Sequence, residues 1–195
     1  MEGADLDIVV YEGVYAPAED SYLLIDSIEI DDSDSVLEIG CGSGVVTTAI
    51  ARVASRVVAT DISQLALRNT KRNLKANAEK CNWSLLQADL LSPLKRARDF
   101  SVIVFNPPYL PQDAERTALD NALIGGESGI ELTTGFLKQA KQRIGEGDTV
   151  YTIASSIADV DGLLRYIGEL DLQYEVIKRK RMFFEELLLL KITLI

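Results

Sequence analysis

The sequence contains no histidine, and this absence excludes several kinds of catalytic site at once. Triads with an imidazole base, histidine metal clusters and imidazole general acids all need that side chain. Cysteine is scarce as well, because Cys41 and Cys81 are too few for a disulfide framework or for a zinc site built from cysteines alone. We therefore expect no bound metal, and two reduced thiols in a cytoplasmic protein.

Positive charge and long apolar runs are also in short supply. The chain has 20 Lys and Arg residues against 30 Asp and Glu residues, a net charge of −10. A nucleic-acid partner would therefore meet an unfavourable overall field. Charges or glycines interrupt every apolar run before it reaches the length of about 18 residues that a membrane helix needs. The first residues also lack the pattern of a signal peptide. The sequence favours a protein or a small molecule as substrate.

What the sequence does contain is an alternation of strand and helix patterns over 195 residues. Apolar or β-branched runs that end in turn residues predict strands at 35–40, 56–61, 83–89, 101–106 and 148–154. Helical spacing predicts helices at 17–28, 44–54, 63–77, 133–144 and 159–170. The tail predicts a hairpin of two strands joined by a basic turn at 178–181.

This alternation predicts right-handed βαβ units and a mostly parallel sheet, in which the late strand pair supplies one antiparallel strand. The expected fold is an α/β three-layer sandwich around a seven-stranded sheet. No linker or repeat indicates a second domain. We expect one domain over 1–195, with an N-terminal segment and helix at 1–34 and a core at 35–195.

A glycine loop follows the first predicted strand, in "VLEIGCGSGVV" (36–46). Gly40, Gly42 and Gly44 allow positive φ there and let the backbone approach a ligand at a helix start. The third glycine of the dinucleotide fingerprint is missing. Glu38, just before the loop, can accept hydrogen bonds from a ligand's ammonium group. The loop alone is a weak indicator of the ligand's class.

Acids also end the next two predicted strands. Asp61 lies about 20 residues beyond the glycine loop, where an acid binds ribose hydroxyls, and Asp89 ends the third strand. Three acids at neighbouring strand ends suit a ligand with an amine, a diol and an exocyclic amino group, and S-adenosylmethionine has these groups and no phosphate. Each acid alone is more often an N-cap or a solvated loop carboxylate. Their register with the glycine loop favours the ligand.

The fourth predicted strand ends in "FNPPY" (105–109), whose prolines cannot donate to a sheet. The side-chain oxygen of Asn106 and the carbonyl of Pro107 can each accept one N–H of a planar amino group, and Tyr109 can stack on its flat face. A nitrogen held in this way is aligned for methyl transfer without any histidine. The alternative is a stiff loop in which Asn106 caps the turn.

These motifs together resemble the class I S-adenosylmethionine-dependent methyltransferases that act on planar amino nitrogens. "VYAPAEDSYLLID" (14–26) further resembles the N-terminal signature of short HemK-like release-factor glutamine methyltransferases of archaea and eukaryotes. Three later segments extend the resemblance to Ile192, and they are "LIGGESGIEL" (123–132), "YTIASS" (151–156) and "FEELLLLKI" (184–192).

The resemblance implies methyl transfer from S-adenosylmethionine to the side-chain amide of a glutamine, in a Gly-Gly-Gln segment of a peptide chain release factor. The residues that it and the glycine loop assign to the cofactor are Ser21, Glu38, Gly40, Gly42, Gly44, Asp61, Asp89, Leu90 and Asn106. The residues that it assigns to the substrate glutamine are Asn106, Pro107, Pro108 and Tyr109, with Tyr15 and Asp20 near the pocket. Asn106, Pro107 and Tyr109 are the expected catalytic residues.

The resemblance also bears on partners. Bacterial members of the family carry a helical release-factor-binding domain in front, whereas 35 residues precede Val36 here. We therefore expect substrate docking by the core surface or by a partner. The family implies a small zinc-binding activator subunit, and the apolar edge strand predicted at 83–88 is a candidate site for it. The alternative is that Trp83 and Leu85 pack beneath a neighbouring helix.

Other functions remain open at this point. A DNA or RNA adenine or cytosine methyltransferase also acts on a planar amine, but it needs base flipping and positive surface. A lysine methyltransferase would make poorer use of two planar acceptors. A non-catalytic cofactor-binding scaffold is a further alternative, against which the intact Glu38, Asp61 and Asn106 argue.

Overall fold

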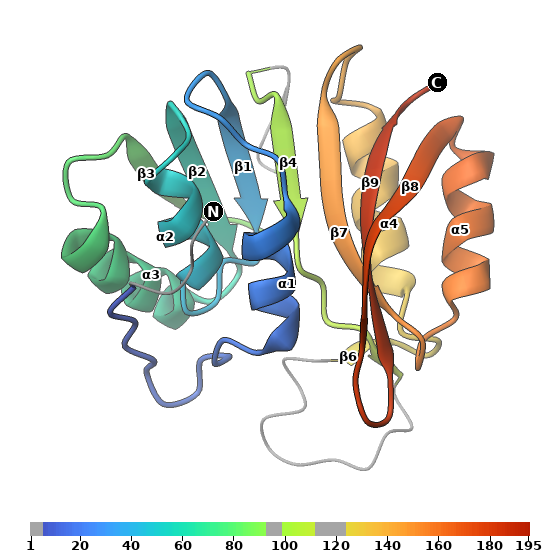
Figure 1. Cartoon of the computed structure of the whole chain (residues 1–195), viewed down its shortest axis with the longest axis horizontal. Helices are drawn as coiled ribbons and strands as arrows, with labels where there is room; N and C mark the ends of the chain where they lie inside the picture. The colour runs from blue at the N-terminus through green and yellow to red at the C-terminus, as the bar shows by residue number, and fades with distance from the viewer. Residues whose placement is uncertain (1–5, 93–98, 112–123) are drawn as a thin grey trace.

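A seven-stranded sheet forms the centre of the computed structural model, which describes residues 6–92, 99–111 and 124–195 (Figure 1). The strand order is β3-β2-β1-β4-β7-β9-β8, and β9 runs antiparallel to both of its neighbours while the other pairs are parallel. The strands are β1 (Ser35–Ile39), β2 (Arg56–Asp61), β3 (Trp83–Gln87), β4 (Val102–Phe105), β7 (Thr149–Ser155), β8 (Leu172–Arg181) and β9 (Glu186–Leu194). The predicted α/β sandwich with one antiparallel strand is confirmed.

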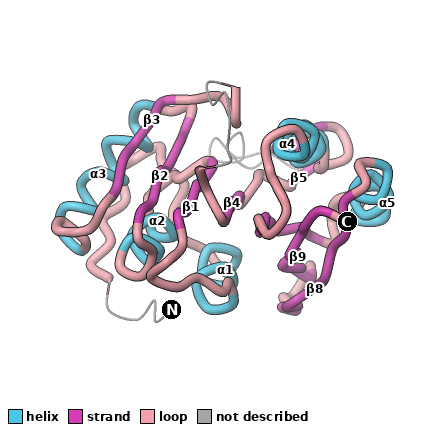
Figure 2. Tube along the Cα trace, turned by 90° about the horizontal axis from the view of Figure 1, so that it is seen from above, coloured by secondary structure: helices cyan, strands magenta, loops and turns pink. Residues whose placement is uncertain are grey.

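Helices cover both faces of the sheet, as Figure 2 shows from above. The helices are α1 (Glu19–Ser27), α2 (Val45–Ala51), α3 (Gln64–Asn77), α4 (Glu131–Lys141) and α5 (Val160–Glu169). The first three share one apolar core with the sheet, and α4 and α5 share the other. Because successive strand residues point to opposite faces, Val36 belongs to the first core and its neighbour Leu37 to the second. Both are fully buried, which explains the continuous apolar pattern of this central strand.

Short polar side chains set the starts of two helices. The Ser63 hydroxyl accepts a hydrogen bond from the Ala66 N–H at 3.3 Å, and α3 begins directly after it. At α5 the Asp159 carboxylate accepts from the Gly162 N–H at 2.9 Å. Each of these bonds satisfies one of the N–H groups that a helix leaves free at its N-terminus.

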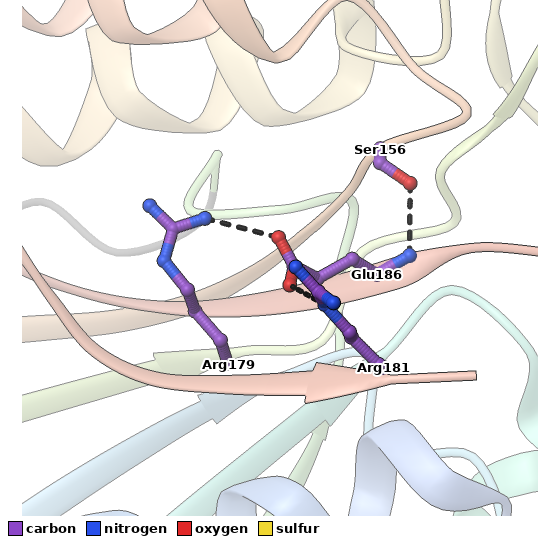
Figure 3. A network of polar contacts seen from close by, with 4 residues as sticks. All are labelled: Ser156, Arg179, Arg181 and Glu186. Atoms are coloured by element: carbon purple, nitrogen blue, oxygen red, sulfur yellow. Dashed lines mark hydrogen bonds and ion pairs between the residues drawn. The ribbon is translucent and has the colours of Figure 1, made fainter.

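The predicted basic turn at 178–181 is wrong, because these residues belong to β8 and the turn of the hairpin is 182–185. Cross-strand ion pairs account for the difference (Figure 3). Arg181 lies directly opposite Glu186 and its Nε is 3.3 Å from the carboxylate, and Nη1 of Arg179 reaches the same carboxylate at 3.1 Å. Opposite charges on facing strands stabilise the pairing, so the basic run continues the strand.

A small second sheet joins β5 (Leu110–Pro111) to β6 (Ile124–Gly126), and the sequence patterns do not predict it. The glycine-rich segment that resembles the family starts at Leu123, outside the described residues, but its later part packs on the proline loop. Gly129 has a φ of 81°, and a Cβ atom there would lie 2.5 Å from the Tyr109 carbonyl oxygen. Only glycine allows the two backbones to approach so closely.

In the described residues no helix is both long and apolar enough to cross a membrane.

An asparagine ladder on α3 holds the N-terminal segment at 7–11 in place. Each side-chain amide oxygen accepts a hydrogen bond from a backbone N–H of the segment: Asn77 from Asp7 at 2.9 Å, Asn73 from Val9 at 3.0 Å and Asn69 from Tyr11 at 2.6 Å. Residues four apart share one face of a helix, so this spacing matches alternate residues of an extended chain.

The central rung of the ladder connects the N-terminal segment to the glycine loop. The Asn73 amide group donates to the Val9 carbonyl and to the Ser43 carbonyl, each at 2.8 Å, and its side chain is fully buried. Ser43 lies between two glycines of the loop. One side chain thus holds two segments that are far apart in the sequence.

We predict that Asn73→Ala lowers the free energy of unfolding by about 2–3 kcal/mol, because three hydrogen bonds of a buried side chain are lost and the Val9 N–H loses its acceptor, while the Val9 and Ser43 carbonyls keep the Asn69 amide as donor. Amide exchange at residues 7–11 should become faster, as measured by mass spectrometry. Asn77→Ala is the matched control, because it removes a rung at the less buried end, and its cost should stay below about 1 kcal/mol. Equal losses for the two variants would contradict this role of Asn73.

Candidate active site

A cavity of about 450 Å³ opens at the carboxyl ends of β1, β2 and β4. Parallel strands end at the same edge of a sheet, so the residues that follow them converge there. The predicted site residues that line the cavity are Tyr15, Asp20, Ser21, Glu38, Gly40, Gly42, Asp61, Asp89, Leu90, Asn106, Pro107 and Pro108. Two predicted residues, Gly44 and Tyr109, do not line it.

Gly44 and Tyr109 have other places in the fold. Gly44 is the N-cap of α2 with a φ of 83°, and a Cβ atom there would lie 2.7 Å from side-chain atoms of Thr70 on α3. Glycine at this position therefore lets α2 and α3 pack closely. Tyr109 is buried in the core under α1, and its hydroxyl donates to the Asp20 carboxylate at 3.4 Å.

Glu38 is a buried carboxyl group on the cavity wall. The Thr47 hydroxyl donates a hydrogen bond to it, and no cation of the described residues forms an ion pair with it. Burial raises the pKa of Glu38 to about 8, and the negative charge of Asp61 adds to the effect while the Thr47 bond opposes it. A positively charged group in the cavity would therefore lower this pKa again and favour the ionised carboxylate.

Asp61 organises the glycine loop from the end of β2. One carboxylate oxygen accepts from the Gly42 N–H at 3.0 Å and the other from the Ser63 N–H at 2.8 Å. Carboxylate oxygens have more than one acceptor position each, so both can still accept from a ligand hydroxyl. Asp61 thus joins the loop after β1 to the start of α3.

The loop after β3 contributes an exposed acid and a strained residue. Asp89 lies at the cavity with its side chain exposed, and Leu90 beside it has a φ of 48°. A left-handed backbone costs a non-glycine residue about 1–2 kcal/mol. Such strain is typical of residues that the surrounding structure holds at a functional site.

Asn106 contributes a buried side-chain oxygen to the cavity. β4 ends at Phe105, and Asn106, Pro107 and Pro108 continue from it along the cavity wall. The Asn106 side-chain oxygen is buried and has no hydrogen-bond partner among the described residues. A buried oxygen left without a donor costs about 1–3 kcal/mol, so the position suits an N–H or O–H group of a ligand.

Two tyrosines and one acid form a cluster at the same end of the cavity. Asp20 is buried, and it accepts from the Tyr15 hydroxyl at 2.9 Å and from the Tyr109 hydroxyl at 3.4 Å. Its other oxygen accepts from the Ser21 N–H at 2.5 Å. Burial and the charge of Asp20 raise the pKa of both phenols, so the tyrosines stay protonated and act as donors.

Sequence reasoning missed several apolar residues of the cavity. Val14, Ile62 and Leu132 line it, and Ile62 is 68% exposed although it is a large apolar side chain. An apolar residue directly after the acid of β2 is a usable signal for Ile62, whereas nothing local indicates Leu132. Cys41 also lines the cavity, and burial together with the charge of Glu38 raises the pKa of its thiol, so it is not poised as a nucleophile.

Known proteins identify the family of this chain. Residues 5–183 match the family model described as the methyltransferase small domain. The chain belongs to this methyltransferase family. A protein of Methanocaldococcus jannaschii that is provisionally named a protein N5-glutamine methyltransferase is 32% identical, over 97% of this chain and 95% of that protein.

Longer and more distant methyltransferases match as well. The release factor glutamine methyltransferase of Clostridium botulinum is 28% identical over 74% of this chain, which spans 56% of that protein's length. Among solved structures, the E. cuniculi Mtq2–Trm112 complex, responsible for methylation of the eRF1 termination factor, contains a chain with a TM-score of 0.69 and 24% identity. That likeness covers 94% of this methyltransferase and 99% of the other chain, and at this identity it shows the shared fold.

We predict that Glu38→Gln stabilises the protein at alkaline pH. Because the pKa of Glu38 is raised in the folded protein, its neutral form stabilises the fold, and this contribution is complete below pH 4.5. The contribution is lost as the pH rises from 4.5 to about 8 and the group ionises. Glutamine stays neutral and can still accept the Thr47 bond. Chemical unfolding should give equal stabilities for the two proteins below pH 4.5, and a gain for the variant of up to about 5 kcal/mol above pH 8. Parallel pH profiles for both proteins would contradict this assignment.

Proposed function

We propose that this methyltransferase uses S-adenosylmethionine to methylate the side-chain amide nitrogen of a glutamine in a peptide chain release factor. The observation that carries the proposal is the buried Asn106 oxygen, which has no donor among the described residues and lies in the same cavity as three acids and the glycine loop. A planar amide nitrogen offers the two N–H groups that such a corner can accept.

The acids and the loop fit the groups of the proposed cofactor. Glu38 provides a buried carboxyl group that a bound ammonium would cause to ionise, Asp61 offers acceptors for a diol, and Asp89 could accept from an exocyclic amino group. Gly40 and Gly42 leave room for close approach of the ligand to the backbone. When bound, S-adenosylmethionine supplies an electrophilic methyl group.

The proline loop would then orient the acceptor. The Asn106 oxygen and the Pro107 carbonyl each accept one N–H of the glutamine amide, which fixes the plane of the nitrogen and turns its face toward the methyl group. The prolines restrict the loop, so little freedom is lost on binding. We propose that Tyr109 acts from behind the cavity wall, by holding Asp20 with its hydroxyl.

The release factor is proposed as substrate because it is the protein that the names of the similar methyltransferases give. We propose that the methylated residue lies in a Gly-Gly-Gln segment, as the family resemblance implies. A nucleic-acid substrate is less well supported, because the chain carries a net charge of −10. Incubation with methyl-labelled cofactor and purified release factor, followed by mass spectrometry of the modified residue, tests the assignment.

We predict that Asn106→Ala lowers kcat by about a hundredfold or more and leaves cofactor affinity within about tenfold, because only the acceptor side is lost. Steady-state kinetics and calorimetric titration with cofactor separate the two effects. Gln139→Ala is the control, because it removes another buried amide oxygen without a partner among the described residues, on α4 and away from the cavity. A fully active Asn106→Ala variant would refute the role.

We also propose that a small activator subunit binds at β3. This strand is the last of the sheet order, so one side of its backbone has no strand partner in the described part of the chain. The side chains of Trp83 and Leu85 are engaged with the first core, and the Trp83 indole donates to the Ala78 carbonyl at 3.1 Å. The proposal therefore rests on the unpaired backbone edge of β3 and on the exposed Leu86, more than on Trp83 and Leu85.

Addition of a purified Trm112-type subunit should slow amide exchange at residues 83–88, because a paired edge strand no longer exchanges freely. The other edge strand, β8, serves as the internal control, and its exchange at residues 173–177 should not change. Binding of the subunit without any protection at 83–88 would place the contact elsewhere.

A further inference from the structure

The turn of the β8–β9 hairpin, residues 182–185, lies at the same edge of the sheet as the cavity. β7 runs parallel to β4, and its last residue, Ser155, pairs with Leu187 near the start of β9. The turn just before β9 therefore projects from the edge at which β4 gives way to Asn106. Figure 1 shows the hairpin extending beyond the ends of β1 and β4.

Polar contacts anchor this turn beside the acceptor end of the cavity. Lys180 forms an ion pair with Glu19, the residue next to Asp20 on α1, and the Ser155 hydroxyl donates to Glu185. The Glu186 N–H donates to the Ser156 hydroxyl oxygen at 2.8 Å, as Figure 3 shows. The turn is thus connected to both α1 and the end of β7.

The turn presents two large aromatic side chains to solvent. Phe183 and Phe184 are 91% and 87% exposed, and their rings contact each other edge to face with centroids 4.6 Å apart. No side chain of the described residues covers them. Met182 before them and Ile157 after β7 are each 38% exposed at the same edge. Exposed apolar groups of this size are costly in water and are typical of protein contact sites.

We propose that Phe183 and Phe184 dock the intact protein substrate while its glutamine occupies the cavity, an inference that rests on the proposed function. A cavity of about 450 Å³ has room for a nucleoside-sized cofactor and one side chain, so the folded protein around that glutamine must lie on the surface at the mouth. Among the described residues at this edge, the two rings of the aromatic pair are the most exposed large apolar side chains. Because the turn is anchored, it presents the rings with little loss of freedom on binding.

The test compares two substrates, the intact release factor and a short peptide that contains only its Gly-Gly-Gln segment. In the Phe183→Ser/Phe184→Ser double variant, kcat/KM for the intact protein should fall about tenfold or more through KM, since exposed aromatic anchors carry much of the binding energy of an interface. The value for the peptide should stay within about twofold, because the peptide does not reach the turn.

Tyr174→Ser is the matched control, because Tyr174 is an exposed aromatic residue of β8 at the end far from the turn, and both kcat/KM values should remain at the wild-type level. Unchanged kcat/KM of the double variant on the intact protein overturns the docking role, as does an equal loss on both substrates. A wild-type enzyme that methylates neither substrate, with or without the Trm112-type subunit, overturns the proposed function itself, and the docking role with it.

Discussion

The two prolines after β4 are the constraint on which the site depends. Because proline cannot donate to a sheet, the ladder between β1 and β4 stops at the pair Ile39 and Phe105, and the chain leaves the sheet as a stiff corner. The Asn106 side chain is left at the end of a buried strand with an oxygen that nothing satisfies among the described residues. The cavity wall thus contains a buried acceptor without a donor, and a ligand with N–H groups can supply that hydrogen bond.

The same edge of the sheet holds other features that cost stability. Glu38 is buried and forms no ion pair with a cation of the described residues, and Leu90 has a left-handed backbone. Each of these would be corrected by a small substitution if stability alone mattered. Their concentration around one cavity indicates that the two apolar cores, one on each face of the sheet, supply enough stability to hold a strained and negatively charged wall in place.

Most of the fold could be predicted from the sequence, because buried parallel strands and amphipathic helices leave strong periodic patterns. The strand ends then located the acids and the proline loop, which are local features. The hairpin was harder, since a run of basic residues is typical of a solvated turn, and only the position of Glu186 on the facing strand shows that the run continues β8.

Parts of the site depend on contacts that no local pattern reports. Gly44 looks like a ligand-contacting glycine, but its partner is Thr70 on another helix. Leu132 reaches the cavity from the start of α4. The asparagines of α3 resemble the polar face of an exposed helix, and only the course of the N-terminal segment shows that Asn69 and Asn73 are fully buried. These roles come from tertiary packing, which the spacing of residues in one segment does not encode.

The asparagine ladder has a consequence for how the N-terminal segment can change. Its hydrogen bonds go to main-chain atoms, so the ladder recognises an extended course rather than particular side chains. Related chains could therefore carry quite different residues along this stretch and still follow the same path over α3, provided that positions 7, 9 and 11 avoid proline, which has no N–H to give. Other sequence changes there would leave the architecture intact, whereas a proline at one of these positions would remove a hydrogen bond of the ladder.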